Sequence, residues 1–568
     1  MTDMRRTLLW VIFTMSLVLL WDAWQKHNGQ PSMFSPAPAK TTSASAPPAP
    51  QAGDTPAAVP GSGAPGVPTP AAVAGSSAPA ALPTGAQGAA ATTFTVTTDL
   101  VKATFSTRGG ELQKMELLQH RDPEVADRNV LLFDQSPQRV YLAQTGLITN
   151  QAGVVLPNHL STLQLSSTQT ALKDGEAAMQ VRFESPEAAG GIKLVKTYTL
   201  KRGDYTIGVK HEVINESAAA VEPQLYLQLV RDGNPPPGES AFYFTFTGPA
   251  MYTDAKKFQK LDFKDIEKNK AEHEKSADNG WVAMVQHYFA SAWIVGNSQP
   301  REYRTAKVGD NLYSIATVLP LGSVAPGASV AHEARLFAGP QEEKKLAELA
   351  PGLELVKDYG WFTVLAKPLF WLLDMLHGVI GNWGWAIVAL VFLLKAAFYW
   401  LNASAYRSMG KMKAINPRIM EMRERLKDKP QQMQQEMMRI YKEEKVNPLG
   451  GCLPILVQMP FFIALYWVLL SSVEMRNAPW VGWISDLAAK DPYFILPLLM
   501  TASSLLQTWL NPTPPDPVQA KLMWIMPIAF SFMFFFFPAG LVLYWLTNNI
   551  LSIAQQWMIN KQLGVLGK

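Results

Sequence analysis

The stretch GNWGWAIVALVFLLKAAFYWLN, residues 381–402, decides the fold of this chain. Its apolar part is about 20 residues long, the length that a helix needs to cross a bilayer, and it carries one charge, Lys395. Four more apolar segments follow, at about 450–473, 492–510, 524–538 and 539–558. Phe537-Pro-Ala-Gly makes a tight turn between the last two. The pattern predicts five membrane-spanning helices in residues 382–560.

Another apolar run, residues 8–24, follows Arg5 and Arg6. Such a run is typical of a signal peptide or of a retained anchor. Because residues 21–26 (WDAWQK) offer no good pair of small residues for cleavage, the pattern favours an anchor within residues 1–30. Basic residues stay in the cytoplasm, so we predict a cytoplasmic N-terminus.

Two extracytoplasmic segments are predicted after this anchor. Residues 31–92 are dominated by Pro, Ala, Gly, Ser and Thr, which indicates a disordered linker. Residues 93–345 contain many short alternating runs and little helical pattern, which predicts a large periplasmic all-β sandwich domain. The clearest expected strands are Phe94–Val96, Ala103–Phe105, Thr197–Leu200, Tyr205–Val209, Gln224–Val230 and Ala241–Phe246.

The apolar segment 357–381 differs from the others because it contains Lys367, Asp374 and His377. The loop 403–448 holds eleven Lys or Arg against six Asp or Glu, so it should be cytoplasmic. If 357–381 crossed the membrane, that loop would lie outside. We therefore predict an amphipathic interfacial helix on the periplasmic face. The map has six transmembrane helices, five of them in the core, with both termini cytoplasmic.

Residues 403–448 show two amphipathic helical patterns around Asp428-Lys-Pro430, which predicts a cytoplasmic helical hairpin. It is either a solvated charged hairpin or a flexible methionine-bearing surface for hydrophobic segments, with Met433, Met437 and Met438. A second cytoplasmic loop is expected at 511–523. The tail 561–568 has only two lysines, which argues against strong ribosome binding through it.

Several function classes are excluded. The net charge of +4 over 568 residues gives no reason to expect nucleic-acid binding. The single cysteine, Cys452, is interpreted as a small apolar residue, since one thiol forms neither an internal disulfide nor a multi-cysteine metal site. We find no nucleotide-binding loop, catalytic triad, carboxylate pair or zinc spacing. We therefore predict no enzymatic activity, no cofactor and no metal, and a binding or docking role for the β domain.

Lys395 is the polar residue that most needs an explanation. A lysine near a helix end either extends to the headgroups or faces a wet cavity. Other polar residues of the spans also need partners in hydrocarbon. Each could be satisfied by an ordinary bond between helices, but one hydrated groove would serve them all. The candidates are Gln458, Ser503, Ser504, Gln507, Thr547, Asn548 and Asn549. A hydrophobic path, along which an apolar segment of another protein could slide, is expected at Phe461, Phe462, Phe535 and Phe536.

Several strings in the core resemble one known family. They are residues 381–384 (GNWG), 445–454 (KVNPLGGCLP), 458–460 (QMP), 491–493 (DPY), 495–497 (ILP) and 537–544 (FPAGLVLY). These strings and the order of segments resemble the YidC/Oxa/Alb insertase family in its Gram-negative form. The resemblance is strong over 357–560 and extends in layout over 94–340, where residues 280–293 match best.

The resemblance implies a groove among the core helices that opens to the cytoplasm and to lipid and contains one cation. In the family that cation is usually Arg, and the matching position here is Lys395. Val391 replaces a polar residue of the family, and Tyr544 and Trp545 are further expected groove residues. The family is a group of inner-membrane insertases and chaperones. Its expected partners are nascent membrane proteins, the lipid bilayer, the Sec translocon with its accessory subunits, and the ribosome.

An alternative function is a small-solute transporter or channel. That class usually shows repeated halves and helices broken near the membrane centre, and this sequence shows no internal repeat. An intramembrane hydrolase would need a nucleophile with a base or paired carboxylates, and we find neither in the spans. A comparison of solute flux with protein insertion in proteoliposomes separates the alternatives.

Overall fold

The structure is a computed structural model, and it describes residues 82–83, 91–122, 125, 127–186, 191–237, 245–427, 429–444, 453–511 and 517–562. These residues belong to one compact unit, residues 79–568. The predicted anchor at 1–30, Cys452 and most of the predicted linker at 31–92 lie outside the described residues.

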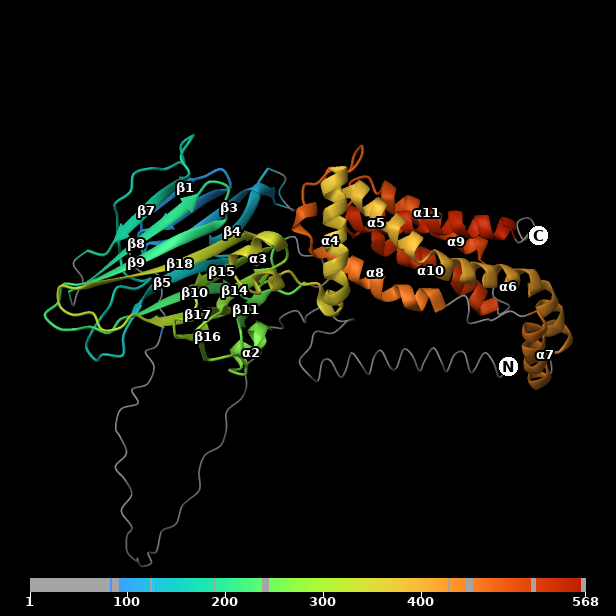
Figure 1. The fold of residues 1–568 in the computed structure, drawn as a ribbon, viewed down its shortest axis with the longest axis horizontal. Helices are drawn as coiled ribbons and strands as arrows, with labels where there is room; N and C mark the ends of the chain where they lie inside the picture. The colour runs from blue at the N-terminus through green and yellow to red at the C-terminus, as the bar shows by residue number, and fades with distance from the viewer. Residues whose placement is uncertain are drawn as a thin grey trace, which may run out of the picture. The chain divides into compact units, whose positions relative to one another are not determined.

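The first part of the described chain is a sandwich of two nine-stranded sheets, as predicted (Figure 1). Neighbouring strands in both sheets pair antiparallel. The first sheet has the order β1 (Thr93–Thr97), β2 (Val101–Ser106), β3 (Glu111–Arg121), β4 (Asn129–Gln135), β5 (Val140–Ile148), β10 (Gln224–Asp232), β17 (Leu312–Pro320), β16 (Arg301–Gly309), β13 (Ser276–Ala277). The second has the order β12 (Lys257–Lys260), β11 (Gly248–Thr253), β14 (Trp281–Gln286), β15 (Phe289–Val295), β18 (Ser329–Pro340), β9 (Thr206–Asn215), β8 (Ile192–Lys201), β7 (Ala178–Glu184), β6 (Gln164–Leu165).

The β8–β9 hairpin shows how the sequence pattern produces this sandwich. Alternate residues of the two strands, such as Leu194 and Val209, are buried between the sheets, as the period of two requires. Gly203 occupies the turn with φ +70°, a conformation that favours glycine. Five of the six strands expected from sequence are present in this way.

The sixth expected strand, Ala241–Phe246, is not found where the structure describes it. Residues 241–244 lie outside the described part, and Thr245 and Phe246 are irregular chain before β11. Phe246 nevertheless packs against the sandwich core. A strand at 241–246 therefore stays a prediction, because four of its six residues lie outside the described part.

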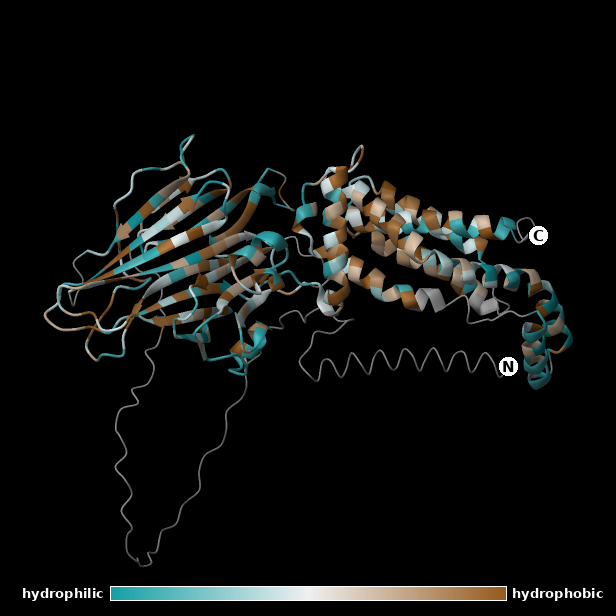
Figure 2. Cartoon of the chain, in the orientation of Figure 1, coloured by the Kyte–Doolittle hydropathy of each residue, from teal (hydrophilic) through white to brown (hydrophobic). Residues whose placement is uncertain are grey.

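Helices make up most of the second part, with two short ones inside the β domain (Figure 1). They are α2 (Phe263–Glu267), α3 (Glu343–Leu349), α4 (Thr363–Ile380), α5 (Trp383–Ala397), α6 (Tyr399–Arg425), α7 (Pro430–Glu443), α8 (Leu453–Ser471), α9 (Ile495–Leu510), α10 (Pro517–Phe534) and α11 (Ala539–Gln562). Short 3-10 turns occur at Leu353–Val356, Gly360–Phe362 and Val473–Met475. Figure 2 shows long hydrophobic stretches on α5 and α8–α11 and a mostly hydrophilic α7.

The predicted interfacial segment 357–381 contains α4, which is amphipathic. One face packs into the helical core through Ala366, Leu369, Phe370 and Leu373. The other exposes Val364, Trp371 and Val379. Among the described helices, α4 alone meets the length and composition of a span by itself, and α5 with α6 meets them only as a pair bent by 69°. Whether α4 lies along the membrane surface therefore stays a prediction.

The apolar stretch 381–402 does not form one continuous helix, because the helix breaks at Phe398 and α6 leaves at that bend. No proline or glycine announces this break. The α11 side chain Gln555 donates to the Tyr399 carbonyl at 3.3 Å, just after the break.

The expected limits of the next-to-last span, 524–538, and of the loop 511–523 also need correction, since α10 runs over Pro517–Phe534. After Phe534 the chain turns, and the amides of Ala539 and Gly540 donate to the carbonyls of Ala489 and Leu487 at 2.7 and 2.8 Å. These bonds hold the turn away from helical geometry.

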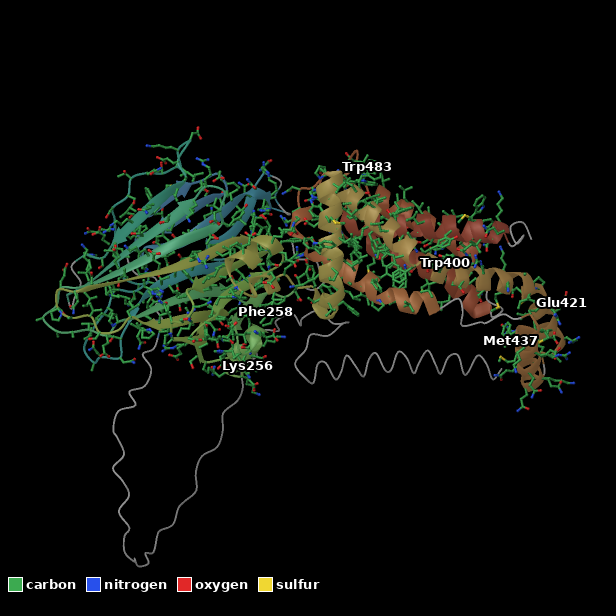
Figure 3. All side chains as sticks on the ribbon, in the orientation of Figure 1. Lys256, Phe258, Trp400, Glu421, Met437 and Trp483 are labelled. Atoms are coloured by element: carbon green, nitrogen blue, oxygen red, sulfur yellow. The ribbon has the colours of Figure 1, made fainter. Side chains whose placement is uncertain are left out.

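The expected hairpin consists of the distal part of α6 and α7, with the break before Pro430 (Figure 3). A small core of its own holds the two helices together. It contains Ile415, Ile419, Met422 and Ile440, with Met412, Leu426, Met433, Met437 and Tyr441 packed against them. Met433 and Met437 therefore serve the hairpin itself, whereas Met420 and Met438 are about half exposed.

Candidate functional site

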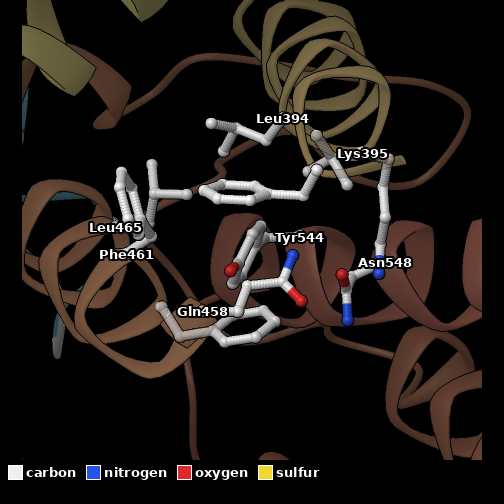
Figure 4. Close-up of a pocket in the computed structure, with 10 residues that line it drawn as sticks. Leu394, Lys395, Gln458, Phe461, Leu465, Tyr544 and Asn548 are labelled. Carbon is white, nitrogen blue, oxygen red and sulfur yellow. The ribbon is translucent and has the colours of Figure 1, made fainter. Parts of the chain in front are cut away.

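A pocket lies where α5, α8 and α11 meet, and it contains Lys395 (Figure 4). α5 and the residue after it contribute Val391, Leu394, Lys395 and Phe398; α8 contributes Gln458, Phe461, Phe462 and Leu465; α11 contributes Tyr544 and Asn548. Four predicted groove residues and two predicted path residues are thus brought together. The wall is mainly apolar and aromatic, with Lys395 as its charged member.

Lys395 points across the pocket toward α11 (Figure 4). Its ammonium donates to the Ser552 hydroxyl at 2.8 Å. Within the described part of the chain, no carboxylate forms an ion pair with this ammonium, and its hydrogen-bond acceptor is the Ser552 hydroxyl. The cation is therefore held by a neutral acceptor, and its charge stays uncompensated.

The start of α5 fixes the register that brings Lys395 to this place. The Asn382 side chain caps the helix by accepting from the Trp385 amide at 3.1 Å, and it donates to the Pro479 carbonyl at 3.1 Å. Gly384 lets Trp480 approach so closely that an added Cβ would lie 2.2 Å from its ring. Three helical turns later, the same helix carries Lys395 into the pocket.

The pocket is narrow. Four of its ten lining residues, Phe398, Phe461, Phe462 and Tyr544, are aromatic, and their rings form much of its boundary. An aromatic wall closes one side, where the rings of Phe462 and Trp545 stack at 5.5 Å with an angle of 3°. Phe398 and Phe461 make an edge contact at 5.1 Å. The Phe462–Trp545 contact joins α8 to α11 at this wall.

The remaining polar candidates lie outside the ten lining residues. Ser503 accepts from the Asn549 side chain at 3.2 Å, and Ser504 accepts from the same amide at 2.9 Å. These bonds join α9 to α11, which is the ordinary bond between helices considered as an alternative above. Thr547 is buried on α11, and Gln507 is half-buried on α9.

Trp545, Phe535 and Phe536 also lie outside the pocket lining. Trp545 stacks on the pocket residue Phe462 from behind the wall. Phe535 and Phe536 lie in the turn between α10 and α11, where Phe535 contacts Phe494 at 5.5 Å. The structure thus places them beside the 490–494 loop, and their role in a hydrophobic path stays a prediction.

A second buried lysine, Lys196, lies inside the β-sandwich and was missed by sequence reasoning. It is fully buried, and its ammonium donates to the carbonyls of Gly109 and Thr145 at 2.6 and 2.7 Å. Burial lowers the pKa of Lys196 to about 7, although Glu111 partly offsets this; burial also raises the pKa of Glu111 to about 7. A lysine in an alternating strand gave no signal of this position.

The described residues contain no group of three or more His, Cys, Asp or Glu side chains that could hold a metal ion. The chemistry that the pocket offers is therefore a positive charge, amide groups and aromatic surface.

Comparisons with known proteins agree with the geometry. Two family models match, "YidC periplasmic domain" over residues 93–372 and "60Kd inner membrane protein" over residues 375–564. A membrane protein insertase YidC from Janthinobacterium sp. (strain Marseille) is 52% identical over 99% of this chain and 100% of its own length. The chain belongs to the YidC insertase family. The family predicted from the sequence is confirmed, as is inner-membrane localisation.

Two further proteins are similar to this chain to different degrees. The membrane protein insertase YidC of Cupriavidus taiwanensis is 55% identical over 99% of this chain and 98% of its length. A crystal structure of an active YidC insertase with its first transmembrane domain resolved covers 81% of this chain and 91% of that one, at 19% identity and a TM-score of 0.38. The relatives are named as insertases rather than as enzymes.

Proposed function

We propose that this chain inserts hydrophobic segments of nascent inner-membrane proteins, and helps them fold, by receiving their polar tails in the Lys395 pocket. One observation carries the proposal: the ammonium of Lys395 has no carboxylate partner among the described residues and faces a pocket bounded by aromatic side chains. A charge inside a membrane protein usually marks a functional path. An acidic substrate tail would supply the missing partner.

Simple energies support this mechanism. Two opposite charges about 4 Å apart attract by about 4 kcal/mol at an effective dielectric constant of about 20, which offsets part of the cost of removing a carboxylate from water. Burial of the substrate's apolar segment in lipid adds about 25 cal/mol per Å². A membrane potential of about 100 mV, negative inside, favours outward movement of each negative charge by about 2.3 kcal/mol. No nucleotide is needed.

The narrowness of the pocket implies an opening step. The stacked rings of Phe462 on α8 and Trp545 on α11 must separate before a segment passes between these helices. An aromatic pair contributes only about 0.5–1.5 kcal/mol beyond its area burial. A bound hydrophobic segment replaces that contact with its own side chains, so the opening is energetically accessible.

The topology of six spans, with both termini in the cytoplasm and the β-sandwich in the periplasm, belongs to this proposal. The excess of basic residues in the hairpin and the exposed apolar face of α4 support it. Because Cys452 is the single cysteine of the chain, replacing it with serine allows single-cysteine labelling. A cysteine at Lys427 should react only after the inner membrane is permeabilised, and one at Lys201 should react in intact spheroplasts.

Partners follow from the exposed surfaces. The hairpin presents Met420, Met438 and many basic groups, which suits weak contacts with a nascent chain or a ribosome. We also propose that the chain inserts its substrates either alone or together with the Sec translocon and its accessory subunits. Crosslinking from a photoreactive residue at Met438, with and without a translating ribosome, tests the first of these contacts.

The decisive experiment measures insertion in proteoliposomes containing the full chain. Lys395→Met and Lys395→Glu should lower the insertion of a substrate with an acidic tail about tenfold or more, because the attracting charge is lost or reversed. Lys521→Ala removes an exposed lysine at the cytoplasmic end of α10 and is the matched control, expected to insert like the wild type. Normal insertion by both Lys395 variants would remove this pocket from the mechanism.

A further inference from the structure

The Ser552 hydroxyl is the acceptor that holds the pocket cation. Ser552 lies on α11, and its side chain is buried, with 3% of its surface exposed. The Lys395 ammonium donates to its Oγ at 2.8 Å. A lysine this close to the end of its helix has the length to extend to the headgroups. The bond to a buried oxygen on another helix opposes that movement.

The hydrogen-bond roles at Ser552 are determined by its own helix. Its hydroxyl proton is donated to the carbonyl of Asn548 at 2.7 Å, one turn earlier. A hydroxyl has one proton and two lone pairs, so the lone pairs are left for other donors. Lys395 uses one of them. Ser552 is thus fixed as an acceptor toward the cation.

The spacing along α11 places this acceptor next to the pocket. Tyr544, Asn548 and Ser552 follow each other at intervals of four, so they lie on one face of the helix. The first two line the pocket, and Ser552 occupies the next turn. The ammonium is therefore tied at one edge of the pocket, where its remaining N–H groups stay available to a substrate.

A carboxylate at position 552 would neutralise the cation, and an apolar residue would release it. A hydroxyl does neither, because it accepts a hydrogen bond without adding charge. We infer that Ser552 is a positioning residue that keeps the Lys395 ammonium in the pocket and so sets the preference for substrates with acidic tails. This inference rests on the proposed function of Lys395.

The test compares full-chain variants in proteoliposomes with two substrates that differ only in an acidic or a neutral tail. Ser552→Ala should lower insertion of the acidic-tailed substrate about tenfold and leave the neutral one within about twofold. Ser552→Thr should insert the acidic-tailed substrate like the wild type, because threonine keeps a hydroxyl that also bonds to the carbonyl one turn earlier.

A matched control separates positioning from packing. Ser472 is equally buried and donates to the Val468 carbonyl one turn earlier, as Ser552 does to Asn548, but it holds no cation. Ser472→Ala should insert both substrates normally. A comparable loss in Ser472→Ala, or an equal loss for both tails in Ser552→Ala, would show a merely structural serine and overturn the inference.

The double variant separates this inference from the proposed function. If Ser552 acts through Lys395, then Ser552→Ala should add less than about twofold to the defect of Lys395→Met. A further tenfold loss in that background would overturn the inference alone. Normal insertion by Lys395→Met would overturn the proposed function, and full activity of Ser552→Ala beside a defective Lys395→Met would overturn only the role of Ser552.

Discussion

The two parts of this molecule each bury a lysine, and they treat it in opposite ways. In the β-sandwich, Lys196 is bonded to two backbone carbonyls, and Glu111 lies near enough to favour its charged form. In the helical core, Lys395 has one hydroxyl partner and no carboxylate among the described residues. The ammonium of Lys196 is bonded within the fold, whereas that of Lys395 has no anionic partner among the described residues. The comparison predicts that the partners of a buried lysine, rather than its burial alone, decide whether it serves stability or function.

Removing Lys196 should have the largest effect on stability. Lys196→Met removes charge-assisted hydrogen bonds to two buried carbonyls, each worth about 1.5–3 kcal/mol, so we expect a loss of about 3–5 kcal/mol in the free energy of unfolding. Urea unfolding of the full chain in detergent, followed by the β-sheet signal in circular dichroism, measures it. Lys193→Met is the control on the same strand, because Lys193 is partly exposed and pairs with Glu184 at 3.0 Å; it should cost less than about 1 kcal/mol. Equal stability of the two variants would contradict a structural role for Lys196.

Glu111 provides the next effect, through pH. Burial raises its pKa from 4.5 to about 7, so the folded state keeps a proton that the unfolded chain releases between these values. Its contribution to stability is therefore full below about pH 4.5 and lost as the pH rises to about 7. Relative to Glu111→Gln, the free energy of unfolding of the wild type should fall by on the order of 3 kcal/mol between about pH 4.5 and pH 7.

The same titration has internal controls. Burial lowers the pKa of His120, His159 and His287 to about 4, so each destabilises the fold as the pH falls from about 6.5 toward 4. These histidines are present in both the wild type and Glu111→Gln, so their effects cancel when the two free energies of unfolding are subtracted. A stability difference between wild type and Glu111→Gln that does not change from pH 4.5 to 7 would show that Glu111 is ionised in the folded state.

Lys395 should show the opposite balance between stability and function. Because its charge compensates no buried anion, Lys395→Met should change the free energy of unfolding by less than about 1 kcal/mol while insertion of acidic-tailed substrates fails. Unfolding of the helical core in mixed micelles, measured on the same samples as the insertion assay, checks both. A loss of stability comparable to that of Lys196→Met would place both lysines in the structural class.

The smallest expected effect concerns the polar residues that bond helix to helix. Asn549 donates to Ser503 and Ser504 between α11 and α9. A double-mutant cycle of Asn549→Leu and Ser504→Ala should give a coupling energy of about 0.6 kcal/mol, typical of such bonds in membranes. A coupling above about 2 kcal/mol would mean that this pair is a major determinant of core stability.

The sequence by itself determined the parts of the molecule that depend on local pattern. Alternation along 192–215 specified a hairpin, because side chains of a strand point to opposite faces. Apolar length specified the membrane core, since unbonded backbone is excluded from hydrocarbon. Pro430 marked the hairpin break, and the strings around 381–384 and 537–544 identified the family. Lys395, Gln458, Asn548 and Phe461 were named from composition and resemblance, and the structure brings them together.

Only the tertiary structure decided which polar residues meet. Lys395 and Ser552 are 157 positions apart, and no local pattern links a lysine on one helix to a serine on another. No proline or glycine near Phe398 announces the bend there, and the interior place of Lys196 depends on carbonyls of β5 and of the turn before β3. Periodicity reports which face of an element is buried, whereas a hydrogen bond requires the position of its partner. That position is set by the packing of the whole chain.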